Sequence, residues 1–197
     1  MYSQNKEEEV ILEFFKDQPN GRCLDIGAYN PETFSNTCQL IKNGWEAVLV
    51  EASPECFKNF EIYYKDNKNV QLVNKAMADF DGPLEFWNSE GANATAVEEH
   101  YDKWKDVQKD YKKIIIDAVS WFTFYKEYPG TYDFISIDAE GMDFDILKQI
   151  NLFETKTKLI CIEFNYNTTP IIDYLKLYGF TNLLYSNAEN IIVSRNF

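Results

Sequence analysis

The sequence predicts an α/β protein built on one doubly wound, mostly parallel sheet. Helical and strand patterns alternate along most of the chain, and the strand patterns are short and apolar, as buried parallel strands are. The last two strand patterns are separated only by a turn over residues 186–189. Strands joined without a crossover helix pair antiparallel, so we expect one C-terminal strand to run against the others.

The first part of the chain alternates regularly. Apolar residues at helical spacing predict a helix over residues 6–16, with acids in the first turn, where the helix dipole favours them. Two cap-plus-proline pairs, Asn30-Pro31 and Ser53-Pro54, predict helices that run to Asn43 and to about residue 66. Strands are expected at residues 22–27, 47–50 and 70–73. This rhythm is typical of right-handed βαβ units.

The alternation breaks between residues 80 and 118, which predicts an insertion. A turn at Asp81-Gly82-Pro83 indicates a hairpin, and a polar loop, a charged helix over 98–107 and a strand over 114–119 follow. Helices are then expected at 121–128, 143–150 and 169–178, and strands at 132–138, 158–164, 182–185 and 190–194. We expect residues 1–197 to form one domain that carries this insertion.

Composition and charge limit the classes of function. The chain has 19 Lys and Arg against 32 Asp and Glu, a net charge of −13, which weighs against a nucleic-acid partner. No leader-like or membrane-spanning apolar segment is present, so we expect a cytoplasmic protein without a membrane partner. The cysteines lie too far apart for a CxxC pair and are predicted to be buried and reduced: Cys23, Cys38, Cys56 and Cys161.

Acidic residues stand at the ends of several predicted strands. In a doubly wound sheet, ligands bind at the carboxyl ends of the strands. Each acid alone is explained by a turn or a helix cap, but carboxylates that meet at one edge repel and need a cation or hydroxyl groups. A ligand with a positive centre, a ribose and an adenine satisfies them. The acids at this edge are Asp25, Glu51, Asp138, Glu140 and Glu163.

The turn after the first strand distinguishes two kinds of nucleotide. A dinucleotide-binding turn reads GxGxxG and presents backbone N–H groups to a pyrophosphate, whereas here only Gly27 is present. Asp25 would repel a pyrophosphate and attract an amino group and a sulfonium, and Glu51 stands where an acid accepts hydrogen bonds from ribose hydroxyls. The pair favours S-adenosylmethionine over NAD. An NAD(P)-dependent oxidoreductase or epimerase is the alternative from another class.

The chain resembles the FkbM family of class I S-adenosylmethionine-dependent methyltransferases in three places. They are residues 25–28 (DIGA), Glu51 and residues 133–143 (DFISIDAEGMD). The similarity begins near residue 20 and continues to the C-terminus. It implies a seven-stranded Rossmann-like fold and methyl transfer to a hydroxyl oxygen of a small molecule or saccharide, with the insertion over residues 80–118 covering the acceptor. It also implies a set of cofactor-binding residues: Asp25, Gly27, Ala28, Tyr29, Glu51, Ala52, Ala76, Met77 and Asp138.

One departure from the family pattern leaves a second alternative. Members usually keep a further glycine after the Asn of the first turn, where this chain has Pro31. Proline removes an N–H group and fixes φ, although that N–H is free at a helix start. A homologue that binds the cofactor without transferring the methyl group is therefore the alternative within the family.

Transfer to oxygen also requires that the acceptor lose a proton. The candidate bases are Asp138, Glu140 and His100, the last either on a solvated face of its charged helix or, if residues 86–104 cover the acceptor, inside the site. Asp138, Glu163 and Asn165 form a hard oxygen set suited to Mg²⁺ or Mn²⁺. The alternative is that Asp138 orders the cofactor loop and Glu163 caps its strand. The sequence leaves the acceptor and the oligomeric state open.

Overall fold

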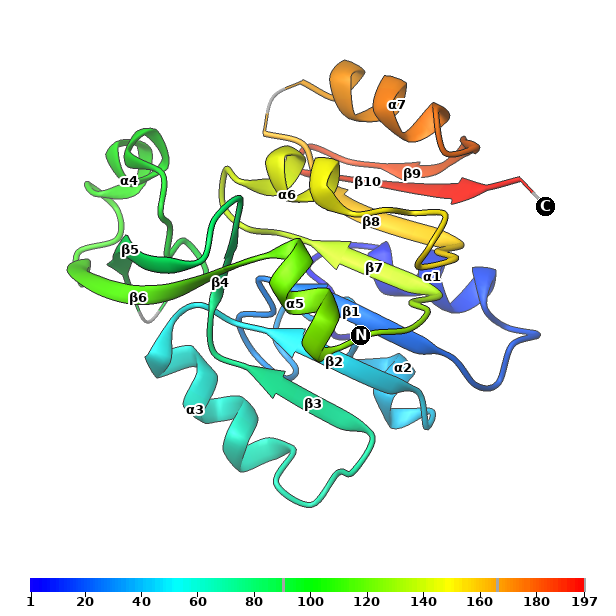
Figure 1. Cartoon of the computed structure of the whole chain (residues 1–197), viewed down its shortest axis with the longest axis horizontal. Helices are drawn as coiled ribbons and strands as arrows, with labels where there is room; N and C mark the ends of the chain where they lie inside the picture. The colour runs from blue at the N-terminus through cyan, green and yellow to red at the C-terminus, as the bar shows by residue number, and fades with distance from the viewer. Residues whose placement is uncertain (90, 166, 197) are drawn as a thin grey trace.

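The centre of the structure is a seven-stranded sheet (Figure 1), seen in a computed structural model that describes residues 1–89, 91–165 and 167–196. The strand order is β3-β2-β1-β7-β8-β10-β9. β10 pairs antiparallel with both of its neighbours, and the other pairs are parallel. The predicted sheet with one reversed strand is thus confirmed. Its strands are β1 (Arg22–Ile26), β2 (Glu46–Val50), β3 (Val70–Val73), β7 (Phe134–Ile137), β8 (Leu159–Glu163), β9 (Phe180–Ser186) and β10 (Asn190–Arg195).

Helices cover both faces of this sheet. α1 (Glu7–Phe14), α2 (Cys38–Lys42) and α3 (Pro54–Tyr63) pack on one face, and α5 (Trp121–Glu127), α6 (Asp143–Gln149) and α7 (Thr169–Lys176) on the other. Alternation along β1 divides its side chains between the two cores, because successive residues of a strand point to opposite faces. Cys23 belongs to the first core, and Leu24 and Ile26 to the second.

The strand order reverses between β1 and β7. The chain proceeds from β1 outward through β2 and β3, and later returns to the other side of β1 with β7. Parallel sheets bind ligands at such a switch point, at the carboxyl ends of the strands. The residues that follow β1 and β7 are therefore the ones that the fold places at a binding crevice.

The second helix starts later than the sequence predicts. The Asn30 side chain accepts the backbone N–H groups two and three residues later, which forms a turn instead of a helix start. The Thr37 hydroxyl donates to Asp25 at 2.6 Å, and the Ser35 hydroxyl accepts the N–H of Cys38 at 3.1 Å. These side-chain bonds hold the chain out of helical geometry until α2 begins at Cys38.

The third helix starts as predicted. The Ser53 hydroxyl accepts the backbone N–H of Cys56 at 3.3 Å, and Pro54 is the first helical residue. The remaining predicted helices and main-sheet strands are present, with ends that differ by a few residues.

The insertion, together with residues 76–78 that precede it, forms a second, three-stranded sheet at one end of the main sheet (Figure 1), with strand order β4-β6-β5. The predicted hairpin is wrong, because β6 lies between the two strands that flank Asp81. The Asp81 carboxylate accepts the N–H of Ser120 at 2.8 Å and the hydroxyl of Thr123 at 2.6 Å, which ties this turn to the end of β6. The elements are β4 (Ala76–Ala78), β5 (Gly82–Asn88), α4 (Glu98–Trp104) and β6 (Lys112–Ser120).

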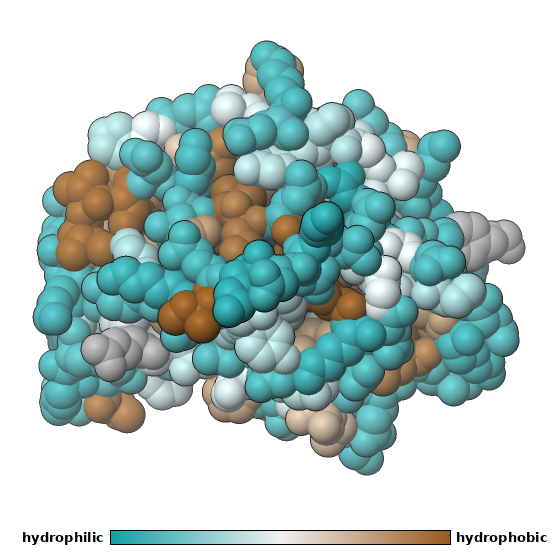
Figure 2. All heavy atoms as spheres, turned by 90° about the horizontal axis from the view of Figure 1, so that it is seen from below, coloured by the Kyte–Doolittle hydropathy of each residue, from teal (hydrophilic) through white to brown (hydrophobic). Residues whose placement is uncertain are grey.

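Hydrophilic residues cover most of the face shown in Figure 2, and its hydrophobic patches are separated from one another. Within the described residues, no helix combines the length and the apolar character that crossing a membrane requires.

Candidate functional site

Two adjoining cavities open at the carboxyl edge of the sheet, beside the switch point. The first encloses about 580 Å³ and the second about 1220 Å³, with the open solvent at their mouths counted in. Five residues line both cavities and so mark where they meet: Gly27, Tyr29, Ala92, Asp138 and Glu140.

The turn after β1 passes against the turn after β7. Gly27 has φ +79°, and a Cβ atom added there would lie 1.7 Å from the carbonyl oxygen of Asp138. The N–H of Asp138 donates to the carbonyl of Ile26 at 2.9 Å, which keeps the two strand ends side by side. Glycine is therefore the residue that permits this approach, because it alone combines a positive φ with the lack of a side chain.

Glu51, at the end of β2, is a buried carboxylate on the wall of the first cavity. It is 6% exposed and accepts the N–H of Tyr29 at 2.7 Å on one oxygen and the N–H of Ser53 at 2.6 Å on the other. Burial raises the pKa of Glu51 to about 7, against the lowering effect of these hydrogen bonds. A carboxylate has about four lone-pair sites, so one remains for a ligand hydroxyl beside the backbone N–H groups of Tyr29, Ser53 and Ala52.

The rest of the first cavity is mainly apolar. Ala52, Ala76, Met77 and Phe86 line it, as the flat face of a purine requires. Ala76 and Met77, two of the expected cofactor-binding residues, lie on β4. A further wall comes from the insertion and was not predicted, although its run of small residues was the available signal: Gly91, Ala92, Ala94 and Ala96.

Asp25 and Ala28 do not line either cavity. Asp25 is 4% exposed within β1, and its carboxylate accepts hydrogen bonds from Thr37 and Ser136. Burial raises the pKa of Asp25 to about 6. The predicted contact between Asp25 and a ligand does not fit this geometry, because the carboxylate already has partners on the α2 side of the sheet. Asp25 instead positions the segment between the first turn and α2.

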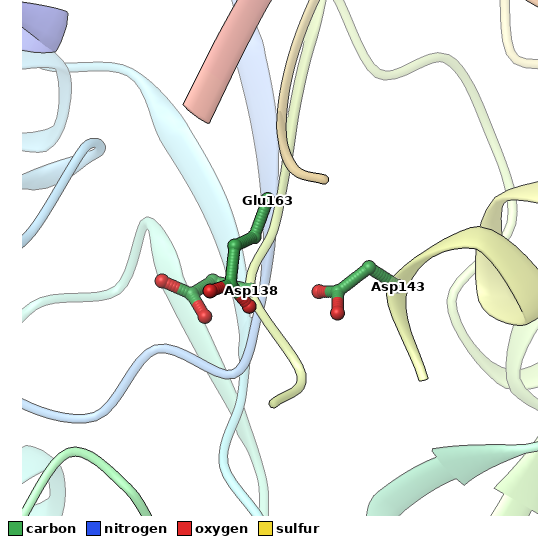
Figure 3. A group of neighbouring side chains, drawn as sticks. All are labelled: Asp138, Asp143 and Glu163. Atoms are coloured by element: carbon green, nitrogen blue, oxygen red, sulfur yellow. The ribbon is translucent and has the colours of Figure 1, made fainter. Parts of the chain in front are cut away.

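Three carboxylates meet at the ends of β7 and β8. One oxygen from each of Asp138, Asp143 and Glu163 lies within 4.8 Å of the others. Figure 3 shows the Asp143 side chain pointing from the start of α6 toward the other two. Burial and the neighbouring carboxylates raise the pKa of Asp138 well above its ordinary value, and the same causes raise the pKa of Glu163 to about 8.

Asp143 was expected only at the start of a helix. In the structure, hydrogen bonds to its carboxylate fix the turn after β7. Its carboxylate accepts the N–H of Ala139 at 2.6 Å, the N–H of Gly141 at 3.1 Å and the amide of Asn165 at 2.7 Å. The predicted metal set was Asp138, Glu163 and Asn165, and the Asn165 side chain hydrogen-bonds both to Asp143 and to Glu163. Because groups of carboxylates also occur without an ion, Mg²⁺ or Mn²⁺ binding stays a prediction.

Unusual backbone conformations concentrate at these cavities. Five non-glycine residues have positive φ among those described, and four of them line a cavity. Such conformations cost on the order of 1–3 kcal/mol each and persist where the surrounding structure holds them, often at functional sites. The four are Tyr29 (φ +53°), Phe34 (φ +60°), Glu140 (φ +48°) and Asn165 (φ +39°).

The second cavity is acidic and partly aromatic. Its wall includes the carboxylates of Glu7, Asp138, Glu140, Glu163 and Glu189, against one cation, Lys103. Tyr29, Phe34 and Trp104 supply rings, and Asn36, Asn93, Asn165 and Asn190 supply amides. Neither Glu7 nor Asn190 was expected at this site, because the N-terminal helix and the last strand reach this edge only in the fold.

His100 lies outside the walls of both cavities, although it is not solvated. It is 8% exposed, and its Nδ1 atom lies 3.4 Å from Oε2 of Glu140. The expectation of a solvated face is thus wrong, and a direct catalytic contact is not seen.

The comparisons with known proteins agree with this architecture. Residues 25–181 match the family described as the methyltransferase FkbM domain. The chain belongs to the FkbM methyltransferase family. Membership makes this FkbM protein an S-adenosylmethionine-dependent methyltransferase, and the family implies that cofactor. No curated protein sequence matches the chain.

Solved structures of methyltransferases share the fold of this FkbM protein. The METTL16 MTase domain has 14% identity and a TM-score of 0.53. The match covers 98% of this chain and 66% of the METTL16 chain, so this chain spans less than two thirds of the METTL16 chain. The putative methyltransferase yhhF from Escherichia coli has 10% identity and a TM-score of 0.51, and the match covers 98% of this chain and 87% of the yhhF chain. The human methyltransferase 10 domain containing protein has 11% identity and a TM-score of 0.51, and the match covers 100% of this chain and 84% of the human chain. At these identities the likeness concerns the fold alone.

Proposed function

We propose that this FkbM protein methylates a hydroxyl oxygen of a small molecule or saccharide. The observation that carries the proposal is the junction of the two cavities. A mainly apolar cavity meets a larger acidic one at Asp138 and Glu140, so a methyl donor in the first faces an acceptor in the second.

The residues of the first cavity fit S-adenosylmethionine. Glu51 keeps a lone-pair site for a ribose hydroxyl, and Ala76 and Met77 offer apolar contact to the adenine. At the junction, the Glu140 carboxylate lies beside the position of the sulfonium. Gly27 and Tyr29 form the wall next to the methionine part.

When bound, this cofactor supplies an electrophilic methyl group, and transfer of that group to a hydroxyl releases one proton. Asp138 and Glu140 line the junction and are the carboxylates in place to take that proton. Burial and the neighbouring carboxylates raise the pKa of Asp138, so its ionised form binds a proton more tightly than an ordinary carboxylate does. The walls of the two cavities align donor and acceptor.

The charge of the second cavity supports an acceptor without phosphate groups. Among the described residues of its wall, acidic side chains outnumber basic ones, so an anionic ligand meets repulsion there. Nucleic acids, which are bound largely through phosphate contacts with Lys and Arg, are disfavoured for this reason. A neutral polyol or phenol satisfies the amides and rings of the same wall.

The test is methyl transfer from methyl-labelled S-adenosylmethionine to a panel of acceptors: neutral saccharides, phenols, amines, a sugar phosphate and an RNA. We expect label on a hydroxyl oxygen of a neutral compound. Label on nitrogen or on the RNA would refute the proposal. Binding of S-adenosylhomocysteine without transfer to any acceptor would favour the inactive homologue, and binding of NADH in its place would favour an oxidoreductase.

A further inference from the structure

The insertion contacts the turn after β7 through its one histidine. His100, the single histidine of the chain, lies on α4, and its side chain is 10% exposed. Its Nδ1 atom is 3.4 Å from Oε2 of Glu140, whose side chain is 18% exposed. A residue of the insertion and a residue of the turn after β7 thus meet in a shielded place, where a hydrogen bond is stronger than in water.

Two further contacts fix the same turn against the insertion. The Thr95 hydroxyl donates to the backbone carbonyl of Glu140 at 2.9 Å. Gly141 has φ +107°, and a Cβ atom there would lie 2.9 Å from the His100 ring and 3.2 Å from a Val97 methyl group. Because the glycine leaves this space, the imidazole ring lies directly on the turn.

Glu140 is the residue that these contacts hold. It has φ +48°, a conformation that needs support from its surroundings, and it lines both cavities. His100 lines neither cavity, so any effect it has on the reaction passes through Glu140.

We infer that His100 is a positioning residue that holds the Glu140 carboxylate at the junction of the cofactor and acceptor cavities. The inference rests on the proposed function, because that function makes the junction the place of methyl transfer. An imidazole with its proton on Nδ1 donates to the carboxylate, which fixes both the tautomer of His100 and the direction of Glu140. The insertion is then part of the active site through this side chain.

Nuclear magnetic resonance tests the contact without an acceptor. Because the chain has one histidine, the ¹⁵N signals of an imidazole ring belong to His100. We expect the Nδ1–H tautomer, and we expect the ring signals to move when S-adenosylhomocysteine is added. The variant Glu140→Ala is expected to lose the tautomer preference and the response. The control Glu99→Gln, at the exposed neighbour of His100 on α4, is expected to keep both. A mixture of tautomers in the parent protein, or the parent response in Glu140→Ala, would overturn the inference.

Kinetics with the acceptor found in the panel test the consequence. Replacing His100 by Leu removes the hydrogen bond, and we expect kcat to fall about 10- to 100-fold, as misplaced catalytic groups do, with little change in KM. His100→Gln keeps a donor and is expected to recover most of the loss. A folded His100→Leu protein with the parent kcat would contradict the inference. If no acceptor is methylated, the proposed function fails, and the spectra still decide whether His100 holds Glu140.

Discussion

The backbone N–H of Tyr29 donates a 2.7 Å hydrogen bond to the Glu51 carboxylate, which joins the turn after β1 to the end of β2. Tyr29 holds φ +53° while it does so, and Glu51 is 6% exposed. Two segments that are separate in the sequence thus form one wall of the first cavity. We expect cofactor binding to depend on this wall.

The first prediction concerns Glu51→Gln. Hydrogen bonds to a charged group contribute about 1.5–3 kcal/mol, so we expect the affinity for S-adenosylhomocysteine to fall about 10- to 100-fold, measured by titration calorimetry. Because ribose hydroxyls donate to the ionised form and the pKa of Glu51 is about 7, the parent affinity should rise from pH 6 to pH 8. The variant should lose this rise. The control Glu46→Gln, at the exposed start of β2, should retain it. Equal affinities in Glu51→Gln and the parent would contradict the assignment.

The second prediction compares two glycines. Gly27→Ala places a Cβ atom 1.7 Å from a backbone oxygen, whereas Gly44→Ala meets nothing within 4 Å, and both have positive φ. We expect Gly44→Ala to cost about 1–2 kcal/mol of unfolding free energy, from the backbone conformation alone. Gly27→Ala should cost more and abolish cofactor binding. Denaturant unfolding and calorimetry measure both, and equal losses in the two variants would show that the close approach is not essential.

The third prediction concerns stability and pH in the absence of ligand. The pKa values of Asp25 (about 6) and Glu51 (about 7) lie above those of ordinary carboxyl groups, so the folded protein keeps protons that the unfolded chain releases above about pH 4. The free energy of unfolding is therefore greatest at about pH 4 and decreases as the pH rises through the pKa values that these groups have in the folded protein. We expect Tm to fall by about 5 °C between pH 5 and pH 8, with a shallower fall in Glu51→Gln. A Tm that rises over this range would contradict the pKa values.

The fourth prediction concerns a divalent ion at Asp138, Asp143 and Glu163. If Mg²⁺ or Mn²⁺ binds there, it favours the ionised carboxylates, so the ion should raise Tm at pH 7 and EDTA should reverse the rise. Glu163→Gln should remove the effect, since Oε2 of Glu163 is buried and has no hydrogen-bond partner among the described residues. No heat on titration with either ion, together with methyl transfer unchanged by EDTA, would rule the metal out.

Local patterns predicted most of the fold. The Ser53-Pro54 pair marks a helix start through bonds that lie within four residues, so the sequence is sufficient. The start of α2 could not be predicted in this way, because it depends on the bond from Thr37 to Asp25 in another element. The order β4-β6-β5 was equally inaccessible, since it depends on β6, which follows β5 after a long connection.

The site was predictable where it depends on strand ends. Glu51 and Asp138 follow buried strands, and parallel strands bring their carboxyl ends to one edge, so both were expected there and line the first cavity. The side to which a residue within a strand points is harder to assign, which is why Asp25 was expected at the cavity but bonds to Thr37. The solvated alternative for His100 rested on its charged sequence neighbours, and only the packing of α4 on the turn at Gly141 buries it.

The most direct test of the central claim is a crystal structure with S-adenosylhomocysteine bound. The account predicts density for the nucleoside in the first cavity, with ribose hydroxyls hydrogen-bonded to Glu51, adenine against Met77 and the sulfur facing Asp138 and Glu140. A nucleoside bound elsewhere, or with its ribose turned away from Glu51, would contradict it.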